Sequence, residues 1–314
     1  MRKLLPALWV CAALYPLSSA AADSQANTHI IGLLAAEPHW LNQAAAISAK
    51  LNHENGLRIV PMLGAGGVQA YQDLMQLNAV DAALISADSL QYASQQKLLN
   101  GAPTKYSYIA RLETLDVVLV AKRNITSVAG LAGKRIATGP AQSAAFATGE
   151  LIFGTLAIPF TRVAKQDEAA IDALLNGTAD AALILGTDFS TAALSDGQYH
   201  VLSLPLNAKF NGLYQPAMMS SSDLPGLVQT GHNIETVSTA LVLAVGDHSR
   251  DALHTESLQV FEDSLFTYLG SDSGANLAAN VPGWKRQQQA QKLLGQRQID
   301  GSDLINIIPT GGKP

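Results

Sequence analysis

Short runs of β-branched and apolar residues alternate with helical patterns along the chain. The runs that predict strands are HIIGLLAA (29–36), LRIVPML (57–63), DAALIS (81–86), DVVLVAK (116–122), RIAT (135–138), HVLSLP (200–205) and STALVLAV (238–245). Crossovers between parallel strands need intervening helices, so this alternation favours α/β layers with largely parallel sheets.

A weak internal repeat divides this pattern in two. AYQDLMQLNAVDAALISAD (70–88) and AIDALLNGTADAALILGTD (170–188) share a helix, a short turn containing Asn, a D-A-A-L-I strand and a final Asp. Chance similarity is the alternative, because alanine-rich helices and such strands are common patterns. Taken at face value, the repeat predicts two similar α/β lobes with a cleft at the carboxyl ends of their strands, where open parallel sheets bind ligands.

The turn in GKRIATGPAQSAAF (133–146) is the first candidate ligand wall. A helix is expected to begin near Ser143 and Ala144, and its first-turn N–H groups could hold a ligand carboxylate or carbonyl. Capping of the helix by the Ser143 hydroxyl explains the same residues and is the simpler interpretation of the turn alone. The helix that follows places Thr148 and Ile152 on a stripe predicted to face the core.

Three further features could meet a ligand in the cleft. Gly66 and Gly67, in the second strand-to-helix turn, would let the backbone approach a ligand closely, although a flexible turn is the alternative. Trp40 could cover a ligand by stacking, or be buried against its own lobe. Asp88 and Asp188 end equivalent strands and could accept hydrogen bonds from a ligand, but we favour capping of the helices that follow them.

Catalytic motifs are missing from this sequence. Its seven histidines include no H-E-x-x-H spacing, and no G-x-S-x-G segment occurs. We therefore predict no enzyme, no cofactor and no metal. The rival hypothesis is a periplasmic enzyme that uses Asp88, Asp188 or a histidine.

The N-terminal segment predicts the cellular compartment of the protein. Met1-Arg2-Lys3, the apolar run LLPALWVCAALYPL and the small residues SSAAAD predict a secretory signal cleaved after Ala22, and hence a periplasmic protein. Cys11, the one cysteine of the 314 residues, lies in that signal, which excludes disulfides and Cys-ligated metals from the mature chain. Cleavage lowers the net charge from −5 to −7, and without a Lys/Arg run no nucleic-acid partner is expected.

The order of motifs resembles a known receptor family. LAGKRIATGPAQSAA (131–145) is similar to the family segment L-K-G-K-R-V-A-V-G-P-P-G-S-G-T, and GAGGVQAY (64–71) to a first ligand loop T-G-G-S-x-x-N-L. SAD (86–88) resembles the strand end Q-S-D, and YQPAMMSSSDLPGL (214–227) the segment I-P-A-G-T-Y-P-G-Q. From about His29 to Leu269 the chain resembles the TAXI family, the periplasmic solute receptors of tripartite ATP-independent (TRAP) transporters.

The resemblance implies a type II periplasmic binding protein: two α/β lobes joined by two crossing hinge strands, residues 115–120 and 237–244, around an interlobe cleft. It divides the chain into a signal peptide (1–22), lobe 1 (23–120 and 229–270), lobe 2 (121–228) and a C-terminal extension (271–314) in which 285–296 predict a short polar helix. The ligand-binding residues expected from the turns and the resemblance are His39, Trp40, Gly66, Gly67, Val68, Ser86, Asp88, Gln142, Ser143, Ala144, Thr187 and Asp188.

The family function implied is that of a monomeric receptor. It would capture a small polar or anionic solute and hand it to TRAP-type permease subunits in the membrane; a sensing or accessory binding protein without transport is the alternative. Several family residues are replaced here. Gly67 and Ala70 stand where the first loop has Ser and Asn, and Gln142 and Ala145 where the second has Gly and Thr, so several side-chain donors are missing. The identity of the solute therefore does not carry over from the family.

Overall fold

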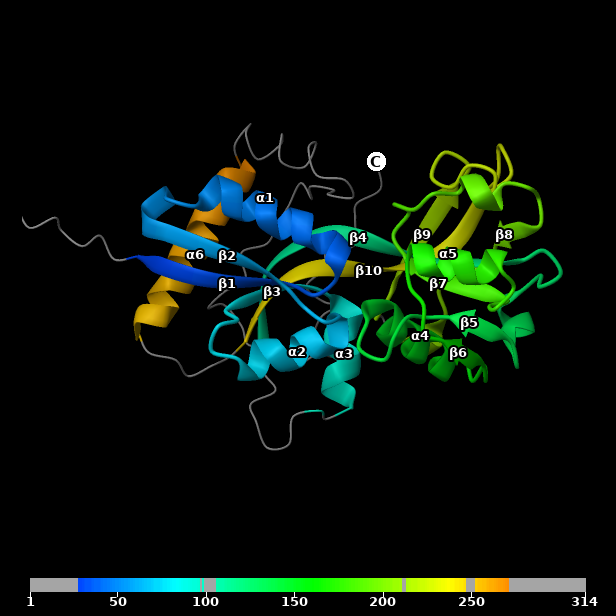
Figure 1. The fold of residues 1–314 in the computed structure, drawn as a ribbon, viewed down its shortest axis with the longest axis horizontal. Helices are drawn as coiled ribbons and strands as arrows, with labels where there is room; N and C mark the ends of the chain where they lie inside the picture. Colours follow the sequence, from blue (N-terminus) through cyan, green and yellow to red (C-terminus); the bar gives the residue numbers. More distant parts are fainter. Residues whose placement is uncertain (1–27, 97, 99–105, 211–212, 247–251, 271–314) are drawn as a thin grey trace, which may run out of the picture.

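A computed structural model describes residues 28–96, 98, 106–210, 213–246 and 252–270. The strands of these residues form a ten-stranded curved sheet with the central order β2-β1-β3-β10-β4-β7-β5-β6, and Figure 1 shows it divided between two lobes. The predicted signal peptide (1–22) and C-terminal extension (271–314) lie outside the described residues. No helix within the described ranges is long and apolar enough to cross a membrane.

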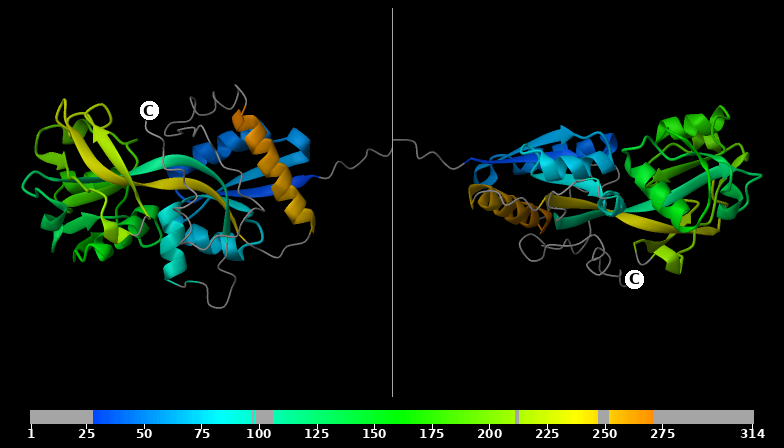
Figure 2. Two further views of the ribbon diagram at one scale, coloured as in Figure 1. Left: turned by 180° about the vertical axis from the view of Figure 1, so that it is seen from behind. Right: turned by 90° about the horizontal axis from the view of Figure 1, so that it is seen from below.

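Lobe 1 is a parallel sheet covered by helices on both faces. Its elements are β1 (His29–Ala35), the short 3-10 helix η1 (Pro38–Trp40), α1 (Leu41–Leu51), β2 (Leu57–Leu63), α2 (Gly67–Gln76), β3 (Ala82–Ser86), α3 (Ala87–Gln95) and α6 (Ala252–Gly270). β1 pairs in parallel with β2 and β3. Helices α1 and α6 cover one face and α2 and α3 the other, as Figure 2 also shows, which is why β3 is buried throughout and apolar up to Ser86.

Lobe 2 repeats this arrangement with shorter strands. Its elements are β5 (Arg135–Ala137), α4 (Ala144–Thr155), β6 (Thr161–Val163), α5 (Glu168–Leu175), β7 (Ala181–Leu185), β8 (Tyr199–Val201) and β9 (Gln215–Ser220). β5 pairs in parallel with β6 and β7. Ile152 of α4 and Leu174 of α5 belong to the two hydrophobic clusters of this lobe, which include alternate residues of β4 such as Val117 and Val118.

The internal repeat corresponds to equivalent parts of the two lobes. The order β2-β1-β3-β10 of lobe 1 matches β6-β5-β7-β4 of lobe 2, so α2–β3 and α5–β7 occupy equivalent places. The glycine turn before α2 therefore corresponds to the turn between β6 and α5. The β5–α4 turn instead corresponds to the β1–α1 connection.

Two long strands connect the lobes. β4 (Tyr106–Lys122) and β10 (Asn233–Gly246) are antiparallel partners, and both run from one lobe into the other (Figure 2). β10 pairs with β9 before residue 239 and with β3 after residue 240, while β4 pairs with β7 from residue 117 onward. The predicted hinge segments 115–120 and 237–244 lie in these strands at the crossing between the lobes.

The two lobes are in direct contact beside this crossing. Ala144, Phe146 and Ala147 of α4, a lobe 2 helix, belong to the hydrophobic cluster of lobe 1. The ring of Phe146 packs edge-on against Tyr92 of α3, with ring centres 5.4 Å apart. One side of the interlobe region is therefore filled by packed side chains.

Candidate functional site

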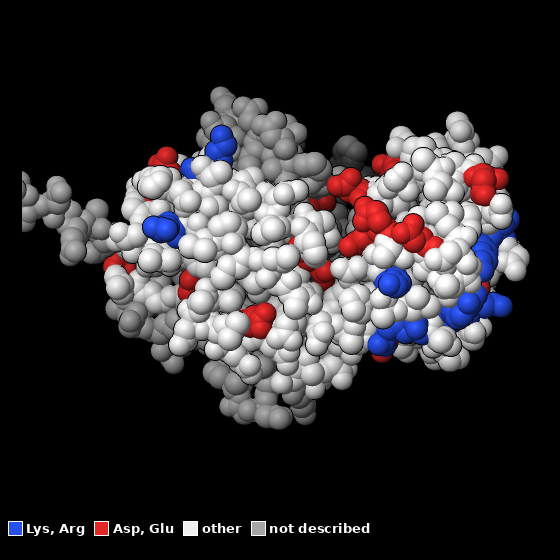
Figure 3. Space-filling model, in the orientation of Figure 1, with Lys and Arg blue, Asp and Glu red and all other residues white. Residues whose placement is uncertain are grey.

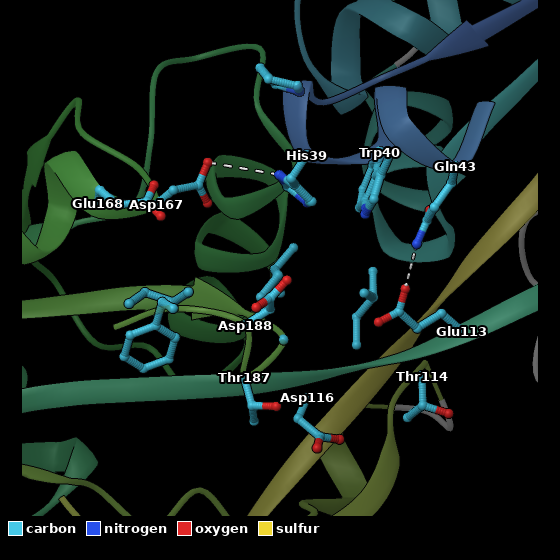
Figure 4. Close-up of a pocket in the computed structure, with 16 residues that line it drawn as sticks. His39, Trp40, Gln43, Glu113, Thr114, Asp116, Asp167, Glu168, Thr187 and Asp188 are labelled. Atoms are coloured by element: carbon cyan, nitrogen blue, oxygen red, sulfur yellow. Dashed lines mark hydrogen bonds and ion pairs between the residues drawn. The ribbon is translucent and has the colours of Figure 1, made fainter. Parts of the chain in front are cut away.

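A cavity of about 210 Å³ lies on the other side of the interlobe region. Lobe 1 contributes η1 and Gln43 of α1, lobe 2 contributes Asp167, Glu168 and residues 184–189, and residues 113–116 of the connecting strand β4 complete the lining. Figure 4 shows these side chains converging from both lobes. A solute bound here would contact both lobes and the strand that joins them.

The lining of this cavity is strongly acidic. It contains no Lys or Arg, one histidine, and the five carboxylic acids Glu113, Asp116, Asp167, Glu168 and Asp188. In Figure 3 acidic side chains gather at the groove between the lobes with one basic side chain beside them, whereas the other basic ones lie toward the outer ends of the two lobes. Among the described residues, no group of three or more His, Cys, Asp or Glu side chains is arranged to hold a metal ion.

His39 and Asp167 face each other across the cavity from opposite lobes. Their Nδ1 and Oδ2 atoms lie 3.9 Å apart (Figure 4). Burial lowers the pKa of His39 and raises that of Asp167, and the attraction between the two groups opposes both shifts. Asp167 has a φ of +52°, a conformation that L-residues rarely adopt, so the turn before α5 holds this side chain at some cost in backbone strain.

Gln43 and Glu113 form a buried pair in the lobe 1 wall. The Gln43 side-chain N–H donates to Oε2 of Glu113 over 3.1 Å. The carbonyl oxygen of the same amide is buried and accepts no hydrogen bond from any described residue. A buried acceptor without a donor is unfavourable, so this wall would gain from a ligand or water that donates to it.

The predicted ligand wall at the β5–α4 turn holds a carboxylate, but that carboxylate belongs to the protein. Oε1 of Glu37 accepts hydrogen bonds from the backbone N–H groups of Gly67 (3.0 Å) and Ala144 (2.6 Å), at the start of α2 and α4. Oε2 accepts from the side chain of Gln166 over 3.1 Å. Burial raises the pKa of Glu37, and these three hydrogen bonds oppose the shift.

The turns around Glu37 touch each other directly. The backbone N–H of Val68 donates to the carbonyl oxygen of Gln142 over 2.8 Å. A Cβ at Gly66 would overlap that same oxygen, so glycine is required for this approach. Ser143 caps α4 by accepting from the Phe146 N–H over 3.1 Å, as the simpler interpretation of the turn predicts.

Asp88 also joins the two lobes. Its Oδ2 accepts hydrogen bonds from the hydroxyls of Thr148 (2.6 Å) and Tyr214 (3.1 Å), both in lobe 2. Burial raises the pKa of Asp88, and its hydrogen bonds oppose the shift. Capping by Asp88 was a wrong prediction, because Ser86 holds the N-cap position of α3. Capping by Asp188 was also wrong, since the next helical turn begins only at Ala192.

The structure thus separates the predicted site residues into two groups. Four of them line the cavity: His39, Trp40, Thr187 and Asp188. The others lie in or beside the packed interlobe contact: Gly66, Gly67, Val68, Ser86, Asp88, Gln142, Ser143 and Ala144. Trp40 is 1% exposed and belongs to the lobe 1 core, so this residue is both buried against its own lobe and part of the cavity wall.

Sequence reasoning missed most of the acidic lining. Glu113 lies next to, and Asp116 within, a segment interpreted only as a hinge. Asp167 and Glu168 lie at the start of a helix, where acidic residues are common. Glu37 carried a usable signal, since a charged residue follows the apolar run 29–36 directly and precedes Pro38-His39-Trp40. The repeat could have aligned this segment with the β5–α4 turn.

Comparison with known proteins identifies the fold. No family model matches the chain, and no curated protein matches its sequence. Solved structures do match: XAC2383 from Xanthomonas citri bound to chloride ion, at 9% identity and a TM-score of 0.51 over 83% of this chain and 92% of that one. The same protein bound to ATP gives 10% identity and a TM-score of 0.50 over the same shares.

A third solved structure has a different source. A putative L-cystine ABC transporter protein from Listeria monocytogenes matches with 14% identity and a TM-score of 0.50, over 83% of this chain and 99% of that one. At these identities the likeness shows the fold alone. The chain has the fold of type II periplasmic binding proteins, with two α/β lobes and a pair of connecting strands.

Proposed function

We propose that this protein binds a small, positively charged solute in the cavity between its lobes. The observation that carries the proposal is the lining of that cavity, in which five carboxylic acids from lobe 2 and from β4 face one histidine and no Lys or Arg. At 210 Å³ the cavity is smaller than the roughly 300–1,000 Å³ of pockets for drug-sized ligands, which suits a small solute.

Electrostatics favours a cation over the anion that the family resemblance suggests. Opposite unit charges 4 Å apart attract by about 4 kcal/mol at the effective dielectric constant near a protein surface, and an anion would be repelled similarly. The buried carbonyl oxygen of Gln43 adds an acceptor that lacks a donor among the described residues, as an ammonium or guanidinium N–H would supply. Trp40 and Phe189 in the same lining could contact such a cation through their rings.

The wider role that we propose is that of an exported, non-enzymatic receptor. Support comes from the fold, from solved relatives of that fold whose names mention a small-molecule ligand or a transporter, and from the cavity between the lobes. The TAXI-like order of motifs and the predicted signal peptide support delivery by a monomer to a TRAP-type permease in the periplasm. A sensing protein without transport is the second candidate, since the same cavity would serve it.

A thermal-shift panel tests the proposal. The mature protein is mixed with the cationic probes arginine, lysine, agmatine and putrescine, the neutral probe glutamine, and the anionic probes glutamate and 2-oxoglutarate. A cation at 100 times its dissociation constant adds about 2.7 kcal/mol to the free energy of unfolding. We expect stabilisation by at least one cation, weaker at high salt because ions screen the attraction.

A matched pair of variants locates the binding. Asp188→Asn removes an exposed carboxylate of the cavity and is expected to weaken cation binding several-fold. Glu54→Gln removes an exposed carboxylate far from the lining residues and is expected to leave it unchanged. Stabilisation by anions in preference to cations would refute the charge argument, and no stabilisation by any probe would refute solute binding.

A further inference from the structure

The contact around Glu37 lies outside the lining of the solute cavity. Its carboxylate lies where the N-termini of α2 and α4 meet, a place suited to a bound anion because unpaired N–H groups converge there. We propose that Glu37 is a built-in carboxylate ligand of the protein, which occupies an interlobe anion site and holds the two lobes together when no solute is bound.

The donors to Glu37 come from both lobes. Glu37 follows β1 and Gly67 begins α2, both in lobe 1, whereas Ala144 and Gln166 belong to lobe 2. One carboxylate oxygen bridges the two backbone N–H groups, and the second oxygen is held by the Gln166 amide. Opening the cleft would separate Glu37 from Ala144 and Gln166, while its hydrogen bond to Gly67 would remain within lobe 1.

Burial makes this arrangement specific for a carboxylate. Glu37 is 3% exposed, so its oxygens depend on these three donors rather than on water. No Lys or Arg forms an ion pair with it among the described residues, and the neighbouring Asp167 carboxylate disfavours its charge. Backbone N–H groups at two helix N-termini therefore supply the attraction that a basic side chain would supply elsewhere.

The surrounding turns are shaped for the closed arrangement. Gly66 and Gly67 carry no side chain at the points where Gln142 and Ser89 approach, and the Val68–Gln142 backbone hydrogen bond joins the same two turns. A larger residue at Gly66 would push the two turns apart, whereas one at Gly67 would first meet the Ser89 side chain within lobe 1. The two lobes are therefore complementary both at the Glu37 carboxylate and along the backbone of the turns around it.

The position of Glu37 links this contact to the cavity. His39 and Trp40, which line the cavity, follow Glu37 after a single proline in η1. Release of the Glu37 carboxylate would free the start of this segment, and with it one wall of the cavity. Opening of the lobes and reshaping of the solute site are therefore coupled through the short segment that runs from Glu37 to Trp40.

The test removes the carboxylate and then returns it as a free molecule. Glu37→Ala deletes a methylene and a carboxylate, which together correspond to acetate. Fluorescent labels are attached to Arg58→Cys in lobe 1 and Lys209→Cys in lobe 2, and energy transfer between them reports the distance between the lobes. Both positions are exposed, and Cys11 is removed with the predicted signal peptide, so that only the two introduced cysteines are labelled. No solute is added, so the outcome does not depend on the proposed cation site.

We expect Glu37→Ala to increase the label separation and the radius of gyration and to lower the melting temperature. Acetate at tens of millimolar is expected to reverse all three changes, whereas the neutral isostere acetamide is not. Glu54→Ala, which removes an exposed carboxylate, is expected to match the wild-type protein with or without acetate. If Glu37→Ala does not fold, Glu37→Gln, which keeps the side-chain volume, is expected to show a smaller opening.

The proposal is overturned by two outcomes. One is a Glu37→Ala or Glu37→Gln protein whose lobes stay as close as in the wild-type protein. The other is a response to acetate no larger than the response to acetamide, which would show that the site does not select a carboxylate.

Discussion

Replacement of Thr148 by Val would measure how firmly the lobes are joined in solution. The Thr148 hydroxyl donates to Oδ2 of Asp88 over 2.6 Å across the interlobe contact, and both side chains are fully buried. The same hydroxyl lies 3.1 Å from the Ala144 carbonyl oxygen within α4. Val keeps the branched shape of the side chain and removes only the hydroxyl, so the packing of α3 against α4 is preserved.

The expected cost follows from the partner that is left behind. Without the Thr148 hydroxyl, Oδ2 of Asp88 keeps the hydrogen bond from the Tyr214 hydroxyl but loses the shorter of these two bonds. Loss of one partner of a buried polar group costs about 1–3 kcal/mol. For a domain of this size each kcal/mol corresponds to roughly 2–4 °C in melting temperature.

Urea unfolding at neutral pH, followed by circular dichroism, would give the free energy of unfolding for each variant. Thr148→Ser serves as the matched control, because it keeps the donor and loses one methyl group at a cost of about 0.8 kcal/mol. We expect Thr148→Val to be the less stable of the two. Equal stability of the Thr148→Val and wild-type proteins, or a Thr148→Ser protein less stable than Thr148→Val, would refute the interlobe hydrogen bond.

Two further predictions concern the same contact. Phe146→Ala is expected to cost about 3–5 kcal/mol in urea unfolding, because the ring is buried against Tyr92 and lies 4.1 Å beneath the Arg162 guanidinium; a loss under about 1 kcal/mol would contradict it. Burial raises the folded-state pKa of Asp88, so the stability it contributes is complete below its unfolded-state pKa and falls as the pH rises through its folded-state pKa. With Asp88→Asn we expect the free energy of unfolding to fall less steeply from acid to neutral pH. An unchanged slope would contradict the raised pKa of Asp88.

Elements whose apolar residues follow a clear period were predictable from the sequence. The strand runs at 29–36, 57–63 and 81–86 coincide with β1, β2 and β3 to within one residue. β1 and β3 are buried along nearly their whole length and so read as continuous runs, whereas the edge strand β2 begins with alternating buried and exposed residues. The strands β6 and β9 were not predicted. β6 has three residues, too few for a period, and β9 contains Pro216, which weakens a strand pattern.

Side chains whose direction depends on the second lobe were harder to predict. Thr148 lies on a helical stripe that was expected to face the core of its own lobe, as Ile152 does. In the structure its hydroxyl reaches Asp88 of the other lobe. Helical periodicity identifies a buried face, but it does not distinguish the sheet beneath a helix from a neighbouring lobe.

The sequence by itself determined the α/β class, the repeat of two similar units, the capped turn at Ser143 and the general position of a cleft, because each depends on residues close together in the chain. Only the tertiary structure decided what fills that cleft. Glu37 meets Ala144 across 107 positions, and the acids of the cavity come from separate elements, β4 and two segments of lobe 2. Such contacts depend on the distance between elements after folding, and no local pattern of residues encodes that distance.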